Sequence, residues 1–198
     1  MLIIGTGGMA REVASIVEYD NPQSKVFFYN NIDLEQHLLW NKYAIYHTDI
    51  ELIEHFKTVE KSFICCIANP LIRQRLIERI QKLGGELGNS ISTRAHVSPM
   101  SIIEKGVVVQ PGSVVASDAT LKTGVFINAL VAIGHDSILH PYVSVGPGAK
   151  ILGNVEIGAH SYIGTNAVIM PGVKIGEKVR IGVGQIITED VPSNSKIN

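Results

Sequence analysis

Aliphatic residues recur at every sixth position through the second half of the chain. Seventeen consecutive positions of this series, from Ile91 to Ile187, hold Ile, Val or Leu. From Ile133 on, a glycine often follows directly, as at Gly134 and Gly158. Neither a helix nor an alternating strand has this period, whereas a hexapeptide repeat that stacks short strands into a parallel β-helix does. We therefore expect the aliphatic side chains to fill a core and the glycines to allow tight corners at positive φ.

The first part of the chain alternates short apolar runs with helical patterns. The predicted strands cover residues 2–4, 25–29, 43–46 and 62–68, and the predicted helices cover residues 11–19, 50–57 and 71–83. Asp49 is the expected cap of the second helix. Strands that alternate with helices are typical of a parallel sheet. The pattern predicts a small parallel, Rossmann-like α/β domain over residues 1–84, followed by the β-helix over residues 85–198.

The turn after the first strand fits the pattern G-x-G-x-x-A, with glycines at Gly5 and Gly7 and alanine at Ala10. The helix behind such a turn offers free N–H groups to phosphate. A dinucleotide site also requires an acidic residue after the second strand, where this chain has Asn30 and Asn31. NAD is therefore not favoured, and a glycine turn without any ligand stays an alternative.

Composition and charge argue against several classes of protein. The net charge of −1 does not favour a nucleic-acid-binding protein. No apolar run has the length of a membrane helix, so membrane insertion is not expected. Cys65 and Cys66 are neighbours in an apolar run and would point to opposite faces of a strand, which disfavours a disulfide between them. We expect reduced core cysteines in a cytoplasmic protein.

The combination of a G-x-G-G α/β domain with a hexapeptide β-helix resembles the sugar acyltransferases related to sialic acid O-acetyltransferase and to the bacterial nucleotide-4-amino-sugar N-acetyltransferases. The resemblance is carried by residues 3–8, 68–73, 128–136 and 148–158. It implies a left-handed coil with eighteen residues per turn and a homotrimer with coenzyme A between subunits. It also implies acetyl-CoA-dependent transfer to an amino group of a nucleotide-activated deoxysugar, in the synthesis of a bacterial surface polysaccharide or glycan, without a metal.

His135 is the candidate general base, because it lies two positions after a core aliphatic residue and a neutral imidazole accepts protons near pH 7. Asp136 follows it and would orient the ring. A surface histidine beside a turn aspartate is the alternative from residue types alone. The resemblance implies that the two residues are the general base and the acid that supports it.

The eighteen-residue period adds a neighbour to this pair. Gly153 stands one turn after His135, where a missing side chain would leave room for a ligand and expose a backbone N–H to a thioester carbonyl. The resemblance implies further acetyl-CoA contacts at Ser144, where relatives often carry a second histidine, and at Thr165 and Val183.

The resemblance also implies a set of contacts to the nucleotide sugar, which consists of Gly7, Gly8, Met9, Asn30, Asn31, Asn69 and Arg73. Relatives usually have acidic residues at the positions of Asn30 and Asn31.

Three other functions stay open. A hydroxyl acceptor would make the enzyme a sugar O-acetyltransferase. A zinc hydratase is suggested by the spacing of His135 and His140, but the expected third ligand position holds Pro99, and three ligands are needed. A non-catalytic sugar-binding scaffold would need no base at all.

Overall fold

The computed structural model describes all 198 residues, which form two compact units, Met1–Asn89 and Ser90–Asn198. The division falls five residues after the predicted one. The reason is strand β6 (Glu86–Leu87), which pairs in parallel with β5 (Ser62–Cys65) and so belongs to the sheet of the first unit.

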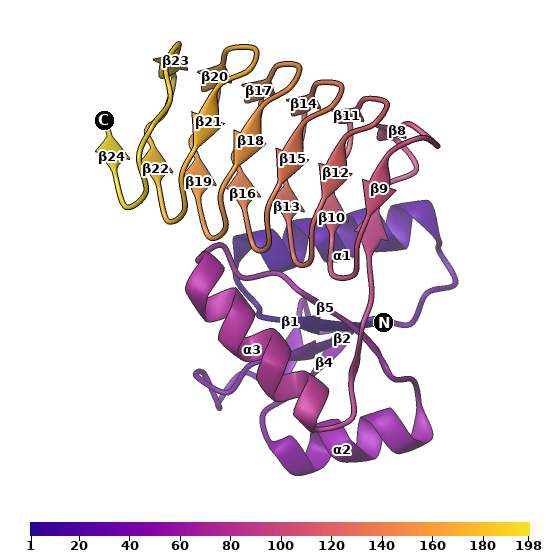
Figure 1. Ribbon diagram of the computed structural model, residues 1–198. Helices are drawn as coiled ribbons and strands as arrows, with labels where there is room; N and C mark the ends of the chain where they lie inside the picture. Colours follow the sequence, from indigo (N-terminus) through magenta and orange to yellow (C-terminus); the bar gives the residue numbers. More distant parts are fainter. The chain divides into compact units, whose positions relative to one another are not determined.

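The first unit is an α/β fold built on a six-stranded sheet with the order β3-β4-β2-β1-β5-β6 (Figure 1). The strands other than β5 and β6 are β1 (Leu2–Ile4), β2 (Phe27–Tyr29), β3 (Leu38–Leu39) and β4 (Tyr43–Tyr46). All neighbours are parallel except β3 and β4. The four predicted strands are confirmed; β1 and β4 have the predicted bounds, and β2 and β5 are shorter than predicted. Strands β3 and β6 were not predicted, because two residues are too few to form a pattern.

Three helices connect these strands: α1 (Gly8–Asp20), α2 (Asp49–Thr58) and α3 (Pro70–Lys82). The predicted cap of α2 was wrong by one residue. The Thr48 hydroxyl accepts from the Glu51 N–H, and the Glu51 carboxylate accepts from the backbone at the cap, which forms a capping box. None of the three helices combines the length and the apolar character of a membrane-spanning helix.

Both cysteines are buried and free, as predicted. Cys65 ends β5 and Cys66 follows it. Burial raises the pKa of the Cys65 thiol to about 12, and that of Cys66 well above its ordinary value. Both side chains are therefore neutral core residues near pH 7.

The second unit is a column of eighteen two-residue strands in three parallel sheets (Figure 1). Paired residues differ by eighteen in number, as in Val108 with Phe126 and Val114 with Ala132, so each turn of the chain contributes one strand to each sheet. The fold is the predicted left-handed parallel β-helix.

We name its sheets by their first strands. The β7 sheet contains β7 (Ser90–Ile91), β10 (Val108–Val109), β13 (Phe126–Ile127), β16 (Ser144–Val145), β19 (Tyr162–Ile163), β22 (Arg180–Ile181) and β24 (Lys196–Ile197). The β8 sheet contains β8 (His96–Val97), β11 (Val114–Val115), β14 (Ala132–Ile133), β17 (Lys150–Ile151), β20 (Val168–Ile169) and β23 (Ile186–Ile187). The β9 sheet contains β9 (Ile102–Ile103), β12 (Thr120–Leu121), β15 (Ile138–Leu139), β18 (Glu156–Ile157) and β21 (Lys174–Ile175).

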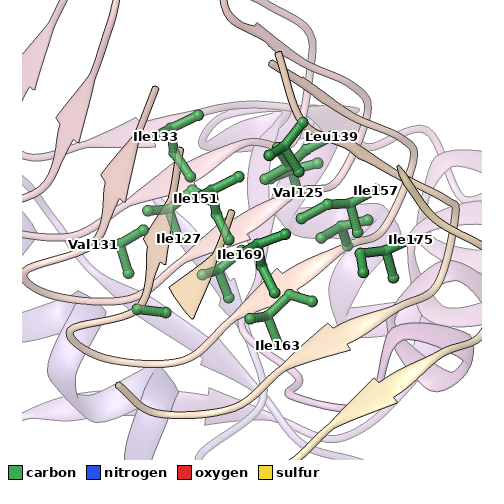
Figure 2. Close-up of a cluster of buried hydrophobic side chains, with 14 of the residues drawn as sticks. Val125, Ile127, Val131, Ile133, Leu139, Ile151, Ile157, Ile163, Ile169 and Ile175 are labelled. Atoms are coloured by element: carbon green, nitrogen blue, oxygen red, sulfur yellow. The ribbon is translucent and has the colours of Figure 1, made fainter. Parts of the chain in front are cut away.

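The aliphatic residues of the six-residue series point into the column, as predicted. Those from Val109 to Ile187 are all buried, and they form one cluster with the Val and Ala residues that stand two positions before most of them (Figure 2). Only Ile91, Val97 and Ile103, in the first turn of the column, are partly or largely exposed. The core is therefore continuous from turn to turn.

The corner glycines differ from the prediction. The backbone has positive φ three positions after each core aliphatic residue, at fourteen successive corners from Gly106 to Gly184. Glycines that follow the aliphatic residue directly, such as Gly134 and Gly158, do not have positive φ. A Cβ there would lie 2.5 Å from the backbone of the next turn. These glycines are needed because successive turns approach closely, and not because of their dihedral angles.

Candidate active site

His135 lies on the edge of the column between the β8 sheet and the β9 sheet, two residues after β14 ends. Its Nδ1 atom is 2.7 Å from Oδ2 of Asp136, and the two side chains are 64% and 54% exposed. A carboxylate accepts only, so Nδ1 carries the proton in this pair and the neutral ring keeps its lone pair on Nε2. The site therefore presents an accessible proton acceptor.

Asp136 has a second role in the backbone. Its φ is 58°, and it occupies the corner position that has positive φ in every turn. Aspartate and asparagine tolerate this conformation better than most residues. The turn role and the contact with His135, alternatives at the level of residue types, are thus both present. Because the corner fixes the backbone conformation of Asp136, it also places the carboxylate beside the ring.

Gly153 lies one turn further along the same edge, and the Asn154 N–H donates to the backbone oxygen of His135 at 2.9 Å. The space beside Gly153 is taken by the imidazole: a Cβ at this residue would lie 2.6 Å from both Cε1 and Nε2 of His135. The expectation that this space is left open for a ligand was therefore wrong. The Gly153 N–H makes no hydrogen bond within the chain, so it stays available as a donor.

The remaining predicted acetyl-CoA residues lie elsewhere on the column. Thr165 and Val183 follow β19 and β22, on the edge between the β7 and β8 sheets. They are one turn apart, because the Gly184 N–H donates to the Thr165 backbone oxygen at 2.8 Å. Ser144 is in β16 and is only 2% exposed. A single chain therefore does not gather these residues around His135.

In the first unit, the loops that carry the predicted sugar-nucleotide contacts meet at one edge of the sheet. They follow β1, β2 and β5, which are neighbours with parallel direction, so their carboxyl ends lie together. β1 is also the point from which the chain order diverges to both sides of the sheet. Ligands of open α/β sheets bind at such a switch point.

The glycine turn at this edge is open. Gly5 is required by the fold, because its φ is 105° and a Cβ would meet Ile67 at 2.9 Å. A Cβ at Gly7 or Gly8 would meet nothing within 4 Å, and neither residue has positive φ. Met9 is partly buried in the first turn of α1. The protein's own packing thus does not explain the two glycines at the start of the helix, whereas close approach of a ligand would.

Three of the predicted substrate residues are engaged in the fold. The Asn30 amide donates to the Thr6 hydroxyl at 2.8 Å, and its oxygen accepts from the Ile32 N–H. Asn69 caps α3 by accepting from two backbone N–H groups of that helix. Arg73 is 1% exposed and donates to the backbone oxygen of Ile67 at 2.7 Å. These side chains shape the loops at the sheet edge.

A cavity of about 740 Å³ that the sequence analysis did not anticipate begins at Asn31. Its wall includes His37, His47 and the ion pair of Asp49 with Arg79. The two histidine rings meet edge to face with centroids 5.3 Å apart. The position of His47, directly after β4, was the available signal, because residues after parallel strands line such edges.

No group of three or more His, Cys, Asp or Glu side chains lies close enough to hold a metal ion. His140, the second histidine of the zinc alternative, pairs with Glu156 at 2.9 Å. It follows β15 on a different edge from His135. The geometry therefore offers no support for a hydratase.

Known proteins match both units. Residues 1–80 match the family described as the PglD N-terminal domain, and residues 133–169 and 154–184 match the bacterial transferase hexapeptide (six repeats). The GDP-perosamine N-acetyltransferase of Escherichia coli O157:H7 is 29% identical over 164 residues, which cover 81% of this chain and 73% of that protein.

Solved structures agree over almost the full length. The acetyltransferase domain of PglB from Neisseria gonorrhoeae FA1090 is 30% identical, with a TM-score of 0.89 over 98% of this chain and 94% of that one. The same domain has been solved in complex with acetyl coenzyme A. WeeI from Acinetobacter baumannii AYE is 26% identical, with a TM-score of 0.91 over 100% of this chain and 95% of that one. Together with the two-unit fold, these matches establish that the chain belongs to the hexapeptide-repeat sugar acyltransferases, the family of sialic acid O-acetyltransferase and the nucleotide-4-amino-sugar N-acetyltransferases.

Proposed function

We propose that this protein is an acetyl-CoA-dependent acetyltransferase that acylates an amino group of a nucleotide-activated deoxysugar, in the synthesis of a bacterial surface polysaccharide or glycan. The observation that carries the proposal is the exposed pair of His135 and Asp136, with Nδ1 and Oδ2 2.7 Å apart. The relative in Escherichia coli is a GDP-perosamine N-acetyltransferase, and the related PglB domain binds acetyl coenzyme A, which supports the same chemistry here.

The reaction needs one base and one polarised carbonyl. The acceptor nitrogen attacks the thioester carbon, a C–N bond forms, and Nε2 of His135 takes the proton that the nitrogen loses. The C–S bond then breaks, and the departing thiolate takes the proton back from the imidazolium. Asp136 stabilises that cation, and the Gly153 N–H is the candidate donor to the oxygen as its negative charge grows. The second unit contains no cysteine, which agrees with direct transfer.

The acceptor's nucleotide is assigned to the carboxyl edge of the first unit. Gly7 and Gly8 leave the start of α1 open to a diphosphate, because helix N-termini present unpaired N–H groups. The cavity of about 740 Å³ beside Asn31 offers the adjoining space for the nucleoside. Asn30 acts there by holding the glycine turn through Thr6.

The decisive experiment combines a substrate screen with one variant. Nucleotide 3-amino and 4-amino sugars are incubated with acetyl-CoA, thiol release is followed, and the product is identified as amide or ester by mass spectrometry and hydroxylamine treatment. His135→Ala should lower kcat by roughly 10²–10⁴ and leave the melting temperature unchanged, because the side chain is 64% exposed.

The matched control is His96→Ala, which removes an exposed histidine from β8 and should keep full activity. Wild-type turnover in His135→Ala would remove the base from the mechanism. Transfer to hydroxyl-only sugars with no transfer to amines would identify an O-acetyltransferase, and no transfer to either class would leave the scaffold function.

A further inference from the structure

Two structural features recur among the positions of the β-helix that require glycine, and Gly153 has neither of them. Some glycines, such as Gly148 and Gly172, have positive φ. Others, such as Gly134 and Gly158, face the backbone of the next turn at about 2.5 Å. Gly153 does not have positive φ, and the three heavy atoms nearest to a Cβ there all belong to the ring of His135.

The sequence register gives an independent reason to look at this residue. Gly153 stands two positions after a core aliphatic residue, and this corner position occurs seventeen times in the series. The other sixteen residues are Thr93, Pro99, Lys105, Pro111, Ser117, Thr123, Ala129, His135, Pro141, Pro147, Ala159, Thr165, Pro171, Glu177, Val183 and Glu189. The backbone at this corner therefore accepts almost any side chain, and glycine occurs only where the residue one turn before is His135.

The distances show how the ring lies. A Cβ at residue 153 would be 2.6 Å from Cε1, 2.6 Å from Nε2 and 3.1 Å from Cδ2 of His135. A point that close to three ring atoms lies above the face of the ring and not beyond its edge. The imidazole therefore rests with one face toward Gly153, while its Nδ1 edge contacts Asp136 and its Nε2 makes no hydrogen bond within the chain.

We infer that Gly153 is a positioning residue: its missing side chain seats the His135 ring flat on the next turn, so that Nδ1 stays on Asp136 and the Nε2 edge stays open to the acceptor. The inference rests on the proposed function of His135 as the base. It is separate from any contact that the Gly153 N–H makes with the thioester, because the two roles depend on different atoms of the same residue.

The substitution Gly153→Ala separates the two roles. Alanine keeps the backbone N–H. If Gly153 acted only as an oxyanion donor, the substitution would therefore have almost no effect on turnover. The added methyl would overlap the ring, which must swing away from Asp136; the ring is the mobile end of an exposed side chain, so it moves before the backbone does. A displacement of this kind at a reacting group lowers turnover by about 10²-fold.

The first measurement is kinetic. Gly153→Ala should lower kcat by about 10²-fold, with KM for acetyl-CoA and the melting temperature unchanged. In a His135→Ala background the same change should cost nothing more, because the ring that it displaces is absent. A Gly153→Ala loss that multiplies with the His135→Ala loss, or that comes with a lower melting temperature, would overturn the inference in favour of a separate or purely structural role.

The second measurement does not require activity. Histidine labelled with ¹⁵N reports the tautomer of His135, which should be the Nδ1–H form in the wild-type protein and a mixture in Gly153→Ala. Ala159→Ser, at the same kind of corner on another edge, is the control and should not change the spectrum of His135. An unchanged tautomer in Gly153→Ala would refute the positioning role even if transfer is observed. A changed tautomer without transfer in the wild type would support the packing of the ring while the proposed function fails.

Discussion

At the scale of single residues, several polar side chains for which the family resemblance implies contacts to the substrate serve the fold. Arg73 is 1% exposed and ties the loop after β5 through the Ile67 oxygen, and Asn69 caps the helix that follows. Asn30 donates to Thr6, which a carboxylate at this position would be unable to do. The amide at position 30 therefore has a structural partner in this chain.

The charge of Asp136 should matter for turnover but not for the stability of the fold. We expect Asp136→Asn to lower kcat by less than the roughly 10²–10⁴-fold loss expected for the base, because the amide oxygen still accepts from Nδ1 but stabilises the imidazolium less. Asparagine tolerates the φ of 58° at this corner, so the melting temperature should not change.

Asp118→Asn is the control for this variant. Asp118 lies one turn earlier on the same edge with a φ of 60°, but Ser117 and not a histidine precedes it. Steady-state kinetics of both variants compare the two positions directly. Equal losses in the two variants would show that the charge acts on the edge as a whole and not on His135.

At the scale of elements, the β-helix is held together by strands of only two residues. The aliphatic side chain of each strand is buried, and the backbone of one turn pairs with the turn eighteen residues on. The distance between successive turns leaves no room for a side chain where their backbones lie closest. At Gly158, for example, an added Cβ would lie 2.5 Å from the backbone of Gly176. Glycine at these positions therefore sets the spacing of the turns.

Two alanine substitutions separate spacing from backbone conformation. Gly158→Ala should reduce the free energy of unfolding by about 3 kcal/mol, because backbone atoms of the next turn must shift. Gly172→Ala should cost about 1 kcal/mol, because it has only the strain of a φ of 76° and open space around the new methyl. Denaturant titrations measure both values. The reverse order would mean that dihedral strain and not turn spacing dominates.

At the scale of the whole molecule, the predicted acetyl-CoA residues lie on two different edges of one column. His135 and Gly153 follow strands of the β8 sheet, whereas Thr165 and Val183 follow strands of the β7 sheet. We propose that acetyl-CoA contacts both sets by binding where edges from two copies come together. Val183 is 70% exposed on its edge, so its side chain is accessible to a ligand or another copy.

We therefore expect a homotrimer in solution, with a mass about three times the 21.5 kDa of one chain. Light scattering coupled to size-exclusion chromatography measures the mass. Val183→Asp should weaken both the assembly and the binding of acetyl-CoA, while Lys150→Ala, on the outer face of β17, changes the charge by the same one unit and serves as the control. A stable monomer that binds acetyl-CoA with full affinity would contradict a site between copies.

The sequence alone determined the register of the β-helix, the four main strands of the first unit and the pairing of His135 with Asp136, because each depends on a short repeat or on neighbouring residues. Only the tertiary structure decided which glycines serve φ and which serve close approach, because that depends on contacts between residues eighteen positions apart. It also decided that Arg73 is buried, that a cavity opens beside Asn31, and that the imidazole of His135 occupies the space at Gly153. These features arise from side-chain packing between distant segments, which no local pattern of residue types encodes.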